Sequence, residues 1–284
     1  MSVLVVENLA RTTFRRVRTA RATTVVAAAI LVIFGLVAVL APLIRPHDPN
    51  SVDLLDAYSG PSVEHLLGTD GSGRDILSRL MSGAGSVLLG ALMLVGVATT
   101  ISIALALTAS WFSGWLDAVI SRGLDIVLAF PGLLIAILAS SVFGASLPTA
   151  ALALSIAYVP FIGRVLRADA TSQRRRPYVQ AVWLEGMSPM RINLGQILPN
   201  LFPTLVAQVV LSLSYAVVDL AAMSYIGLGV QPPTSDWGIM VLSGQAGVLQ
   251  GAPTEVIAAS SCLVLLVLSL GILGDALSEW AERS

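Results

Sequence analysis

Long, nearly uncharged hydrophobic stretches alternate with shorter polar segments along the chain, and this alternation predicts its elements. The stretches occupy residues 23–44, 80–116, 126–163, 201–229 and 255–274. A helix needs about 20 apolar residues to cross a bilayer, so each stretch predicts a membrane span, and the second holds one at about 85–109. The third is too long for one helix, and Gly144 and Pro148 divide it into a predicted hairpin of two spans. We therefore expect six transmembrane helices.

Composition supports an all-α integral membrane protein. Hydrophobic residues make up 56% of the 284 residues and charged residues only 12%, whereas an ordinary soluble domain is about 25% charged. The single cysteine, Cys262, lies in an apolar stretch and is interpreted as a buried, inert thiol. No disulfide is possible within the chain.

Arginines set the expected orientation of the spans. One cluster precedes the first span and another lies between the fourth and fifth: Arg11, Arg15, Arg16, Arg18 and Arg21, then Arg164, Arg167, Arg174, Arg175, Arg176 and Arg191. Positive residues favour the cytoplasmic side of a membrane, and an even number of spans separates the two clusters. Both clusters and both termini are therefore expected in the cytoplasm, with the first helix retained and not cleaved as a signal peptide.

The polar segment 45–79 is expected on the external side, together with the turn near Gly144 and residues 230–254. It is too long for a simple turn, and we expect it to pack on the outer face of the helices. It contains both histidines of the chain, His47 and His65. No cysteine or matching carboxylate pattern accompanies them, so they are interpreted as surface residues and not as metal ligands.

The chain lacks the usual catalytic motifs. The patterns H-E-x-x-H, C-x-x-C and G-x-S-x-G are absent, and without any lysine the chain cannot form a G-x-x-x-x-G-K-[ST] phosphate loop. We therefore expect no enzymatic activity and no cofactor in this chain. If ATP drives a process here, another chain must hydrolyse it.

The loop between the fourth and fifth spans carries a short amphipathic pattern. Val179, Val182, Trp183 and Gly186 fall at i, i+3, i+4 and i+7, which places them on one face of a helix. Pro177 suits the first turn of that helix, and Pro189 limits its end. So short a helix is not stable alone, so it must lie either in a groove of a partner or at the lipid interface. The pattern alone favours neither.

The same loop resembles the cytoplasmic signature of ABC-importer permeases, E-A-A, three residues, G, nine residues, I-x-L-P. Ala181, Gly186, Leu198 and Pro199 match it, whereas Gln180, Val182 and Gln196 depart from it. Four other stretches match the peptide and nickel permeases in order and spacing: LGTDGSGRDILSRLMSG at 67–83, LDIVLAFPGLLIAI at 124–137, YIGLGVQPPTSDW at 225–237 and LGDAL at 273–277. The chain resembles the second permease subunit (DppC/OppC type) of a dipeptide, oligopeptide or nickel ABC importer.

The resemblance implies a type I importer permease (MetI-like) fold in a bacterial cytoplasmic membrane. It implies a second homologous permease subunit, two ATPase subunits (or one fused chain) that bind ATP and Mg²⁺, and an extracytoplasmic binding protein, with no nucleic acid. The chain would form half of a pore for di- or oligopeptides. Alternatives are a nickel, chelate or haem-like cargo, a secondary transporter that works without ATP, and a membrane scaffold.

Site residues follow from the same resemblance. The ATPase-coupling loop would comprise Tyr178, Val179, Ala181, Val182, Trp183, Glu185, Gly186, Ser188, Leu198 and Pro199. In it, Val179, Val182 and Trp183 would supply the buried contact, and Gly186 would allow close backbone approach. Arg174 to Arg176 are interpreted as an anchor on anionic headgroups rather than as a nucleotide contact.

Two further sets of residues are candidates. Asp219 lies within a span and either lines the translocation path or forms an interhelical hydrogen bond or a salt bridge to the partner subunit. Asp70, Arg74, Asp75 and Trp237 are candidate external partner contacts, with Trp237 alternatively an interfacial anchor. At the cytoplasmic end of the third span, Arg122 and Asp125 are expected to pair locally.

The chain is therefore predicted to consist of five consecutive segments. It comprises a cytoplasmic tail 1–22, a first transmembrane helix 23–44, an external loop 45–79, a five-helix core 80–277 containing the coupling loop 168–199, and a cytoplasmic tail 278–284. The ending GDALSEWAERS departs from the usual family terminus, and Asp219 stands one residue from the position where the family usually has an acid.

Overall fold

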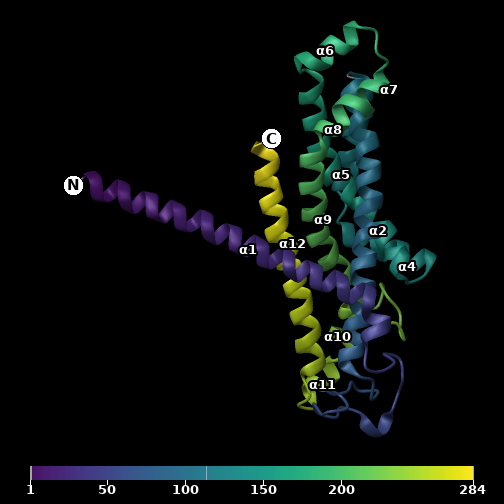
Figure 1. Ribbon diagram of the computed structural model, residues 1–284. Coiled ribbons are helices and arrows are strands. Elements are labelled where there is room, and N and C mark those ends of the chain that lie inside the picture. The colour runs from purple at the N-terminus through teal and green to yellow at the C-terminus, as the bar shows by residue number, and fades with distance from the viewer. Residues whose placement is uncertain (1, 113, 284) are drawn as a thin grey trace.

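The computed structural model is built from helices and describes the backbone of residues 2–112 and 114–283 and the side chains of 22–112 and 114–282 (Figure 1). In order the elements are α1 Ser2–Ile44, η1 Leu54–Asp56, α2 Ile76–Trp111, α3 Trp115–Leu128, α4 Gly132–Phe143, α5 Leu147–Arg174, α6 Pro177–Leu184, α7 Pro189–Ile192, η2 Asn193–Ile197, α8 Leu198–Asn200, α9 Phe202–Tyr225, α10 Trp237–Ser243, α11 Gln245–Leu249 and α12 Thr254–Arg283. The arginine cluster before the first span lies outside the described side chains.

Five of these helices are long and apolar enough to cross a membrane: Ala22–Ile44 of α1, α2, α5, α9 and Thr254–Glu282 of α12. A sixth span exists if α3 and α4, which meet at 79°, count as one. The predicted third span is therefore corrected: it begins at Trp115 and breaks before Pro131, which cannot continue a helix because it has no N–H. Counting uncharged residues missed α3 because α3 carries Asp117, Arg122 and Asp125.

The predicted hairpin turn is confirmed near Gly144, whose φ of +89° requires a glycine-like backbone. The turn does not reach the end of the bundle, however. Leu147, the first residue of α5, contacts α2 at Gly90, about 20 Å along α2 from its first residue. A methyl group on Gly90 would lie 2.7 Å from Leu147 Cδ1 and 3.1 Å from Leu220 Cδ1, so this glycine lets α2, α5 and α9 meet closely.

Helix α2 is the centre of the bundle and contacts α1, α5 and α9. Its buried face is rich in small residues: Gly83, Ala84, Gly90, Ala91, Ala98, Ser102, Ala106 and Ala109. Small side chains let membrane helices approach closely, which is how such helices gain packing energy without a hydrophobic driving force. Helix α1 ends at Ile44, and α12 continues without a break to Arg283.

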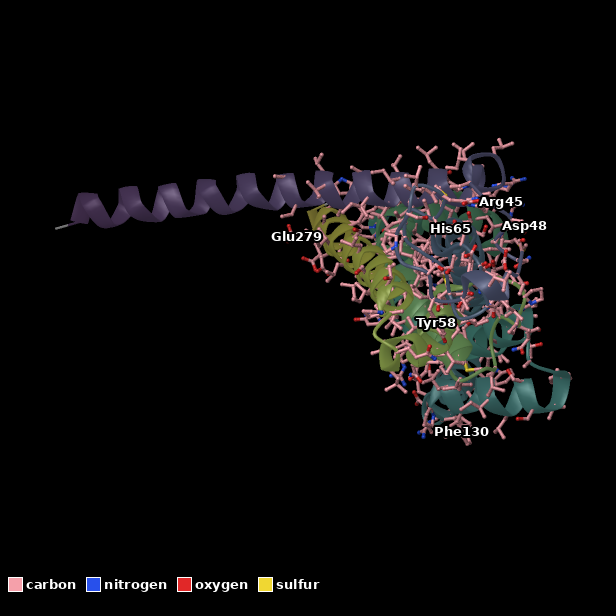
Figure 2. All side chains as sticks on the ribbon, turned by 90° about the horizontal axis from the view of Figure 1, so that it is seen from below. Arg45, Asp48, Tyr58, His65, Phe130 and Glu279 are labelled. Carbon is pink, nitrogen blue, oxygen red and sulfur yellow. The ribbon has the colours of Figure 1, made fainter. Side chains whose placement is uncertain are left out.

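The segment between α1 and α2 packs on one end of the bundle, next to α10 and α11, as expected for the external loop (Figure 1). Figure 2 looks onto this end, with Tyr58 over the helices and Arg45 and Asp48 at the rim. Tyr58 meets α11, because a methyl group on Gly247 would lie 3.0 Å from its ring. The opposite end carries α6 and α7.

Trp237 lies in the core and is neither an interfacial anchor nor an exposed contact, which corrects the expectation. Its side chain is among the largest fully buried ones, and the residue is only 1% exposed. Its indole N–H donates to the carbonyl oxygen of Leu80 at 2.9 Å, and its ring meets Phe34 edge-on with centroids 5.3 Å apart. It therefore joins α10 to α1 and α2.

Replacing Trp237 with Ala is expected to destabilise the protein by about 3–5 kcal/mol, because it opens a cavity and removes the hydrogen bond from the indole N–H to Leu80 O. The control is Trp115→Ala, since Trp115 is 75% exposed. Thermal unfolding of the purified chain in detergent, followed by size-exclusion chromatography, measures both. Equal melting temperatures for the two variants would contradict the buried role.

Candidate functional site

Helix α6 stands at one end of the bundle and has clear start and stop signals. Pro177 occupies its first turn, where a missing N–H is not needed. At its end, the N–H of Met187 donates to Val182 O at 3.2 Å, and that of Gly186 donates to Trp183 O at 3.0 Å. This pair of bonds is a Schellman motif, and it places Gly186 at φ +83°. Gly186 is thus required for its left-handed backbone and not for close packing, since none of the described residues would lie within 4 Å of a methyl group there.

One face of α6 is buried in the chain itself. Val179 is 2% exposed and belongs to a cluster, here called the anchor cluster, with Leu107, Ala170, Ile192, Ile197 and Leu201. Val182, Tyr178, Met187 and Leu198 pack against it. The expectation that Val179 faces a partner is therefore wrong: the loop folds back, and Val179 attaches α6 to α2, α5 and the turns before α9, with the half-buried Val182 packed beside it.

Tyr178 adds polar contacts to this attachment. Its hydroxyl donates to Gln173 Oε1 at 3.0 Å and accepts from the side-chain amide of Asn200 at 3.2 Å. Burial raises the pKa of Tyr178 above its usual value, so the hydroxyl keeps its proton at neutral pH and remains a donor. After this attachment the short α8 ends at Asn200, and α9 begins at Phe202.

The opposite face of α6 and its turn is exposed. Its exposed residues are Gln180, Ala181, Trp183, Leu184, Glu185, Gly186 and Ser188. Two of them are large and apolar: Leu184 is 87% exposed and Trp183 is 58% exposed. Ala181, Trp183, Glu185, Gly186 and Ser188 were predicted for this site. Leu184 was missed, although its place one residue after Trp183 puts it on the neighbouring face of the helix.

Beside this face lies a hollow of about 520 Å³ lined by residues of α2, α3, α5 and α6, among them Trp111, Asp117, Arg174, Arg175, Trp183 and Leu184. Trp111 and Trp183 meet edge-on, with ring centroids 6.3 Å apart. Arg174 donates to the carbonyl oxygen of Ser110, and its guanidinium carbon lies 4.9 Å from the centre of the Trp111 ring. Arg174 is thus a structural contact, while Arg175 and Arg176 are exposed, as a headgroup anchor requires.

Two ion pairs connect α3 to α5 near this end. Arg167 holds Asp117 through two hydrogen bonds of 2.6 Å, and Arg164 pairs with Asp125. Asp125 therefore pairs with Arg164 and not, as expected, with its neighbour Arg122. Sequence spacing could not reveal a partner on another helix.

Asp219 forms an interhelical hydrogen bond. The hydroxyl of Tyr158 on α5 donates to Asp219 Oδ2 on α9 at 2.7 Å. Asp219 was expected either to line the translocation path or to form an interhelical contact, and this geometry favours the interhelical contact within this chain. Asp219 stays half-exposed, on a helix that also carries the exposed Tyr215 and Val218.

The other candidate external contacts are mostly buried. Asp70 and Asp75 are 1% and 2% exposed, so neither is free to touch a partner. Asp70 Oδ2 accepts from Arg74 Nε at 2.8 Å and lies 3.5 Å from Arg79 Nε, so both arginines are paired with this one buried carboxylate.

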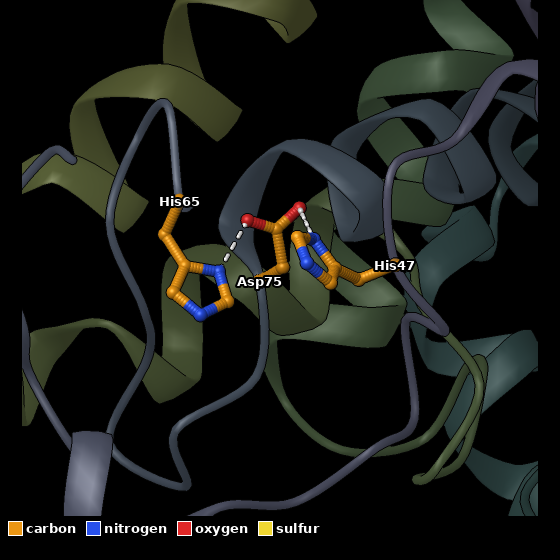
Figure 3. Close-up of side chains that lie close together, drawn as sticks. All are labelled: His47, His65 and Asp75. Atoms are coloured by element: carbon orange, nitrogen blue, oxygen red, sulfur yellow. Dashed lines mark hydrogen bonds and ion pairs between the residues drawn. The ribbon is translucent and has the colours of Figure 1, made fainter. Parts of the chain in front are cut away.

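The two histidines stay at the surface, with side chains 36% and 16% exposed, but they are not isolated there. Both His47 and His65 turn towards Asp75 (Figure 3).

Comparison with known proteins identifies the chain's relatives. The family profile described as binding-protein-dependent transport system inner membrane component matches residues 98–284. A second profile, the N-terminal TM domain of oligopeptide transport permease C, matches residues 9–61.

Individual relatives agree with these profiles. The dipeptide transport system permease protein DppC of Alkalihalophilus pseudofirmus is 36% identical over 88% of this chain and 82% of its own length. The probable D,D-dipeptide permease DdpC of Escherichia coli K12 is 36% identical over 80% and 76%, and the glutathione permease GsiD of Escherichia coli O157:H7 is 32% identical over 89% and 84%.

A solved structure of the MetNI methionine ABC transporter, in an inward-facing conformation, contains a chain of the same fold. The TM-score is 0.59 at 18% identity, over 72% of this chain and 97% of that one. The predicted MetI-like fold is confirmed.

The Gly186 turn yields a matched pair of variants. Gly186→Ala is expected to cost about 1 kcal/mol, because alanine disfavours a positive φ. Gly195→Ala, in a helical turn with open space around it, is expected to be neutral or slightly stabilising. Thermal unfolding compares the two; equal effects would show that the Schellman turn does not require glycine.

Proposed function

The chain belongs to the family of binding-protein-dependent transport-system inner membrane components, and we propose that it is the permease subunit forming half of the pore of an ATP-driven importer for di- or oligopeptides. Supporting the substrate class, relatives from different organisms are named as permeases for dipeptides, D,D-dipeptides and glutathione. All three substrates are short peptides. The alternatives of a nickel or haem-like cargo and of a secondary transporter have no such support.

Coupling to an ATPase is supported by the contrast between the two faces of α6. Its inner face is fixed by Val179 in the anchor cluster, whereas its outer face exposes Leu184 and Trp183. Exposed apolar side chains on a short helix suit the groove of another protein. We assign this face to an ATPase subunit, which would hold ATP and Mg²⁺ and perform the hydrolysis, so that this chain itself is not an enzyme.

The anchor cluster explains how such docking would move the pore. When ATP closes the ATPase pair, α6 is displaced together with its partner groove. Since Val179 packs against residues of α2, α5 and the turns before α9, the bundle follows as a body and does not unfold locally. This is a rigid-body switch driven by the higher affinity of ATP for the closed state.

The remaining partners are assigned by position. The face of α9 and α12 around Val218, Ala221, Leu263, Val264 and Leu268 is apolar and shallowly hollowed, which suits the second permease subunit or lipid. The loop end, opposite α6 (Figure 1), would receive the extracytoplasmic binding protein. If α6 meets the ATPase, its end of the bundle is cytoplasmic, and α12, whose last residues lie towards that end, places the C-terminus there too.

Leu184→Asp is expected to abolish co-purification of the ATPase subunits with the tagged chain, because it places a charge in the centre of an apolar contact. Leu249→Asp is the matched control, since Leu249 is 90% exposed on α11 at the other end. Both variants should insert and melt like the wild type. Retention of the ATPase by Leu184→Asp would contradict the assignment of this face.

The substrate proposal is tested separately with the reconstituted importer. Dipeptides presented with the binding protein should stimulate ATP hydrolysis several-fold, whereas the free amino acids should not. Stimulation by a metal chelate and not by peptides would overturn the peptide assignment while leaving the coupling role intact.

A further inference from the structure

Three metal-ligating side chains from separate parts of the external loop converge at the start of α2. His47 follows α1, His65 lies in the middle of the loop, and Asp75 caps the N-terminus of α2 (Figure 3). The Nδ1 atom of His65 lies 3.0 Å from Asp75 Oδ1, and that of His47 lies 4.0 Å from Asp75 Oδ2. Ligand atoms of all three residues lie within 4.8 Å of one another.

Each residue is held in place by contacts of its own. Asp75 Oδ2 accepts from the backbone N–H of Ser78 at 2.8 Å, and the N–H of His47 donates to the Ser78 hydroxyl at 3.0 Å. The N–H of His65 donates to the Ser62 hydroxyl at 2.9 Å. These bonds hold the Asp75 carboxylate and the backbone from which each imidazole extends, independently of the contacts among the three side chains, as a preorganised site requires.

A simple carboxylate–histidine hydrogen bond accounts for His65 but not for His47. The Nδ1 atom of His47 is buried and has no hydrogen-bond partner among the described residues, and 4.0 Å to Asp75 is too long for a hydrogen bond. A buried polar atom without a partner is costly. Its position, facing the same carboxylate as His65, is explained if a cation lies between them.

The local charges favour a cation at this point. The nearby arginines Arg74 and Arg79 both pair with Asp70, so among the residues whose side chains the structure describes Asp75 forms ion pairs with the two histidines and with no arginine. A carboxylate that is 2% exposed and is not matched by a permanent positive charge gains much from a bound metal ion.

We propose that His47, His65 and Asp75 form a binding site for a divalent transition metal, with Zn²⁺ as the best-matched ion. Two imidazole nitrogens and one carboxylate oxygen are typical Zn²⁺ ligands, each about 2 Å from the metal, so binding would draw His47 closer to the other two ligands. The side chain of His47 is 36% exposed, which leaves a fourth position open to water or to a partner's ligand. The ion would fasten three points of the external loop to the first turn of α2.

The test is zinc binding by the full-length chain in detergent, purified through a tag without histidine and carrying Cys262→Ser to remove its thiol. Titration calorimetry with ZnCl₂ at pH 7.5 is expected to show one ion per chain. His47→Asn and His65→Gln should each weaken binding at least tenfold, as losing a ligand costs at least as much as losing a supporting contact. Asp75 is left intact because it caps α2.

Glu64→Gln is the matched control, since Glu64 is an exposed acidic neighbour of His65 and should leave the affinity unchanged. Thermal unfolding gives a second readout: zinc should raise the melting temperature of the wild type and of Glu64→Gln but not of the double variant His47→Asn/His65→Gln. Absence of zinc binding by the wild type, or equal binding by the double variant, would overturn the proposal. Neither outcome depends on the transport function.

Discussion

The burial of Val179 is the contact on which this account depends. A helix as short as α6 is not stable alone, and it is held by packing Val179 among Leu107, Ala170 and residues of the turns before α9. The same packing turns the exposed face with Leu184 outward. One apolar contact thus both stabilises α6, the proposed docking helix, and joins it mechanically to the long apolar helices of the bundle.

Helix α2 links this end of the molecule to the other. Near its last residues it receives Arg174 of α5 at the carbonyl oxygen of Ser110, and its first residues are fixed by the Asp75 cap and by Arg79, which donates to Pro49 O at 3.0 Å. Buried charges such as Arg79 and Asp70 are costly unless paired, so their pairing specifies one arrangement of the external loop. A displacement of α6 would therefore reach that loop along a single continuous helix.

The class of fold, most spans and the short helix between two prolines could be predicted from the sequence, because these features depend on long apolar stretches and local turn chemistry. Sequence-based prediction failed for contacts between residues that lie far apart in the chain. Amphipathic spacing identified Val179 and Trp183 as one face, but not that Val179 is covered by the chain's own Ile192 and Ile197. Trp237 looked like a surface residue, and the two histidines looked unpaired, for the same reason: the residues near them in the sequence do not reveal Leu80 or Asp75 as the contact.

Site-directed disulfide cross-linking within the assembled importer tests the central claim most directly. In a Cys262→Ser background, a cysteine at Leu184 should cross-link to a cysteine scanned along the ATPase groove, and ATP should change the yield as the ATPase pair closes. A cysteine at Val179, only five residues away but buried in the anchor cluster, should not cross-link. Efficient cross-linking from Val179 and none from Leu184 would show that α6 docks by the opposite face and would contradict the account.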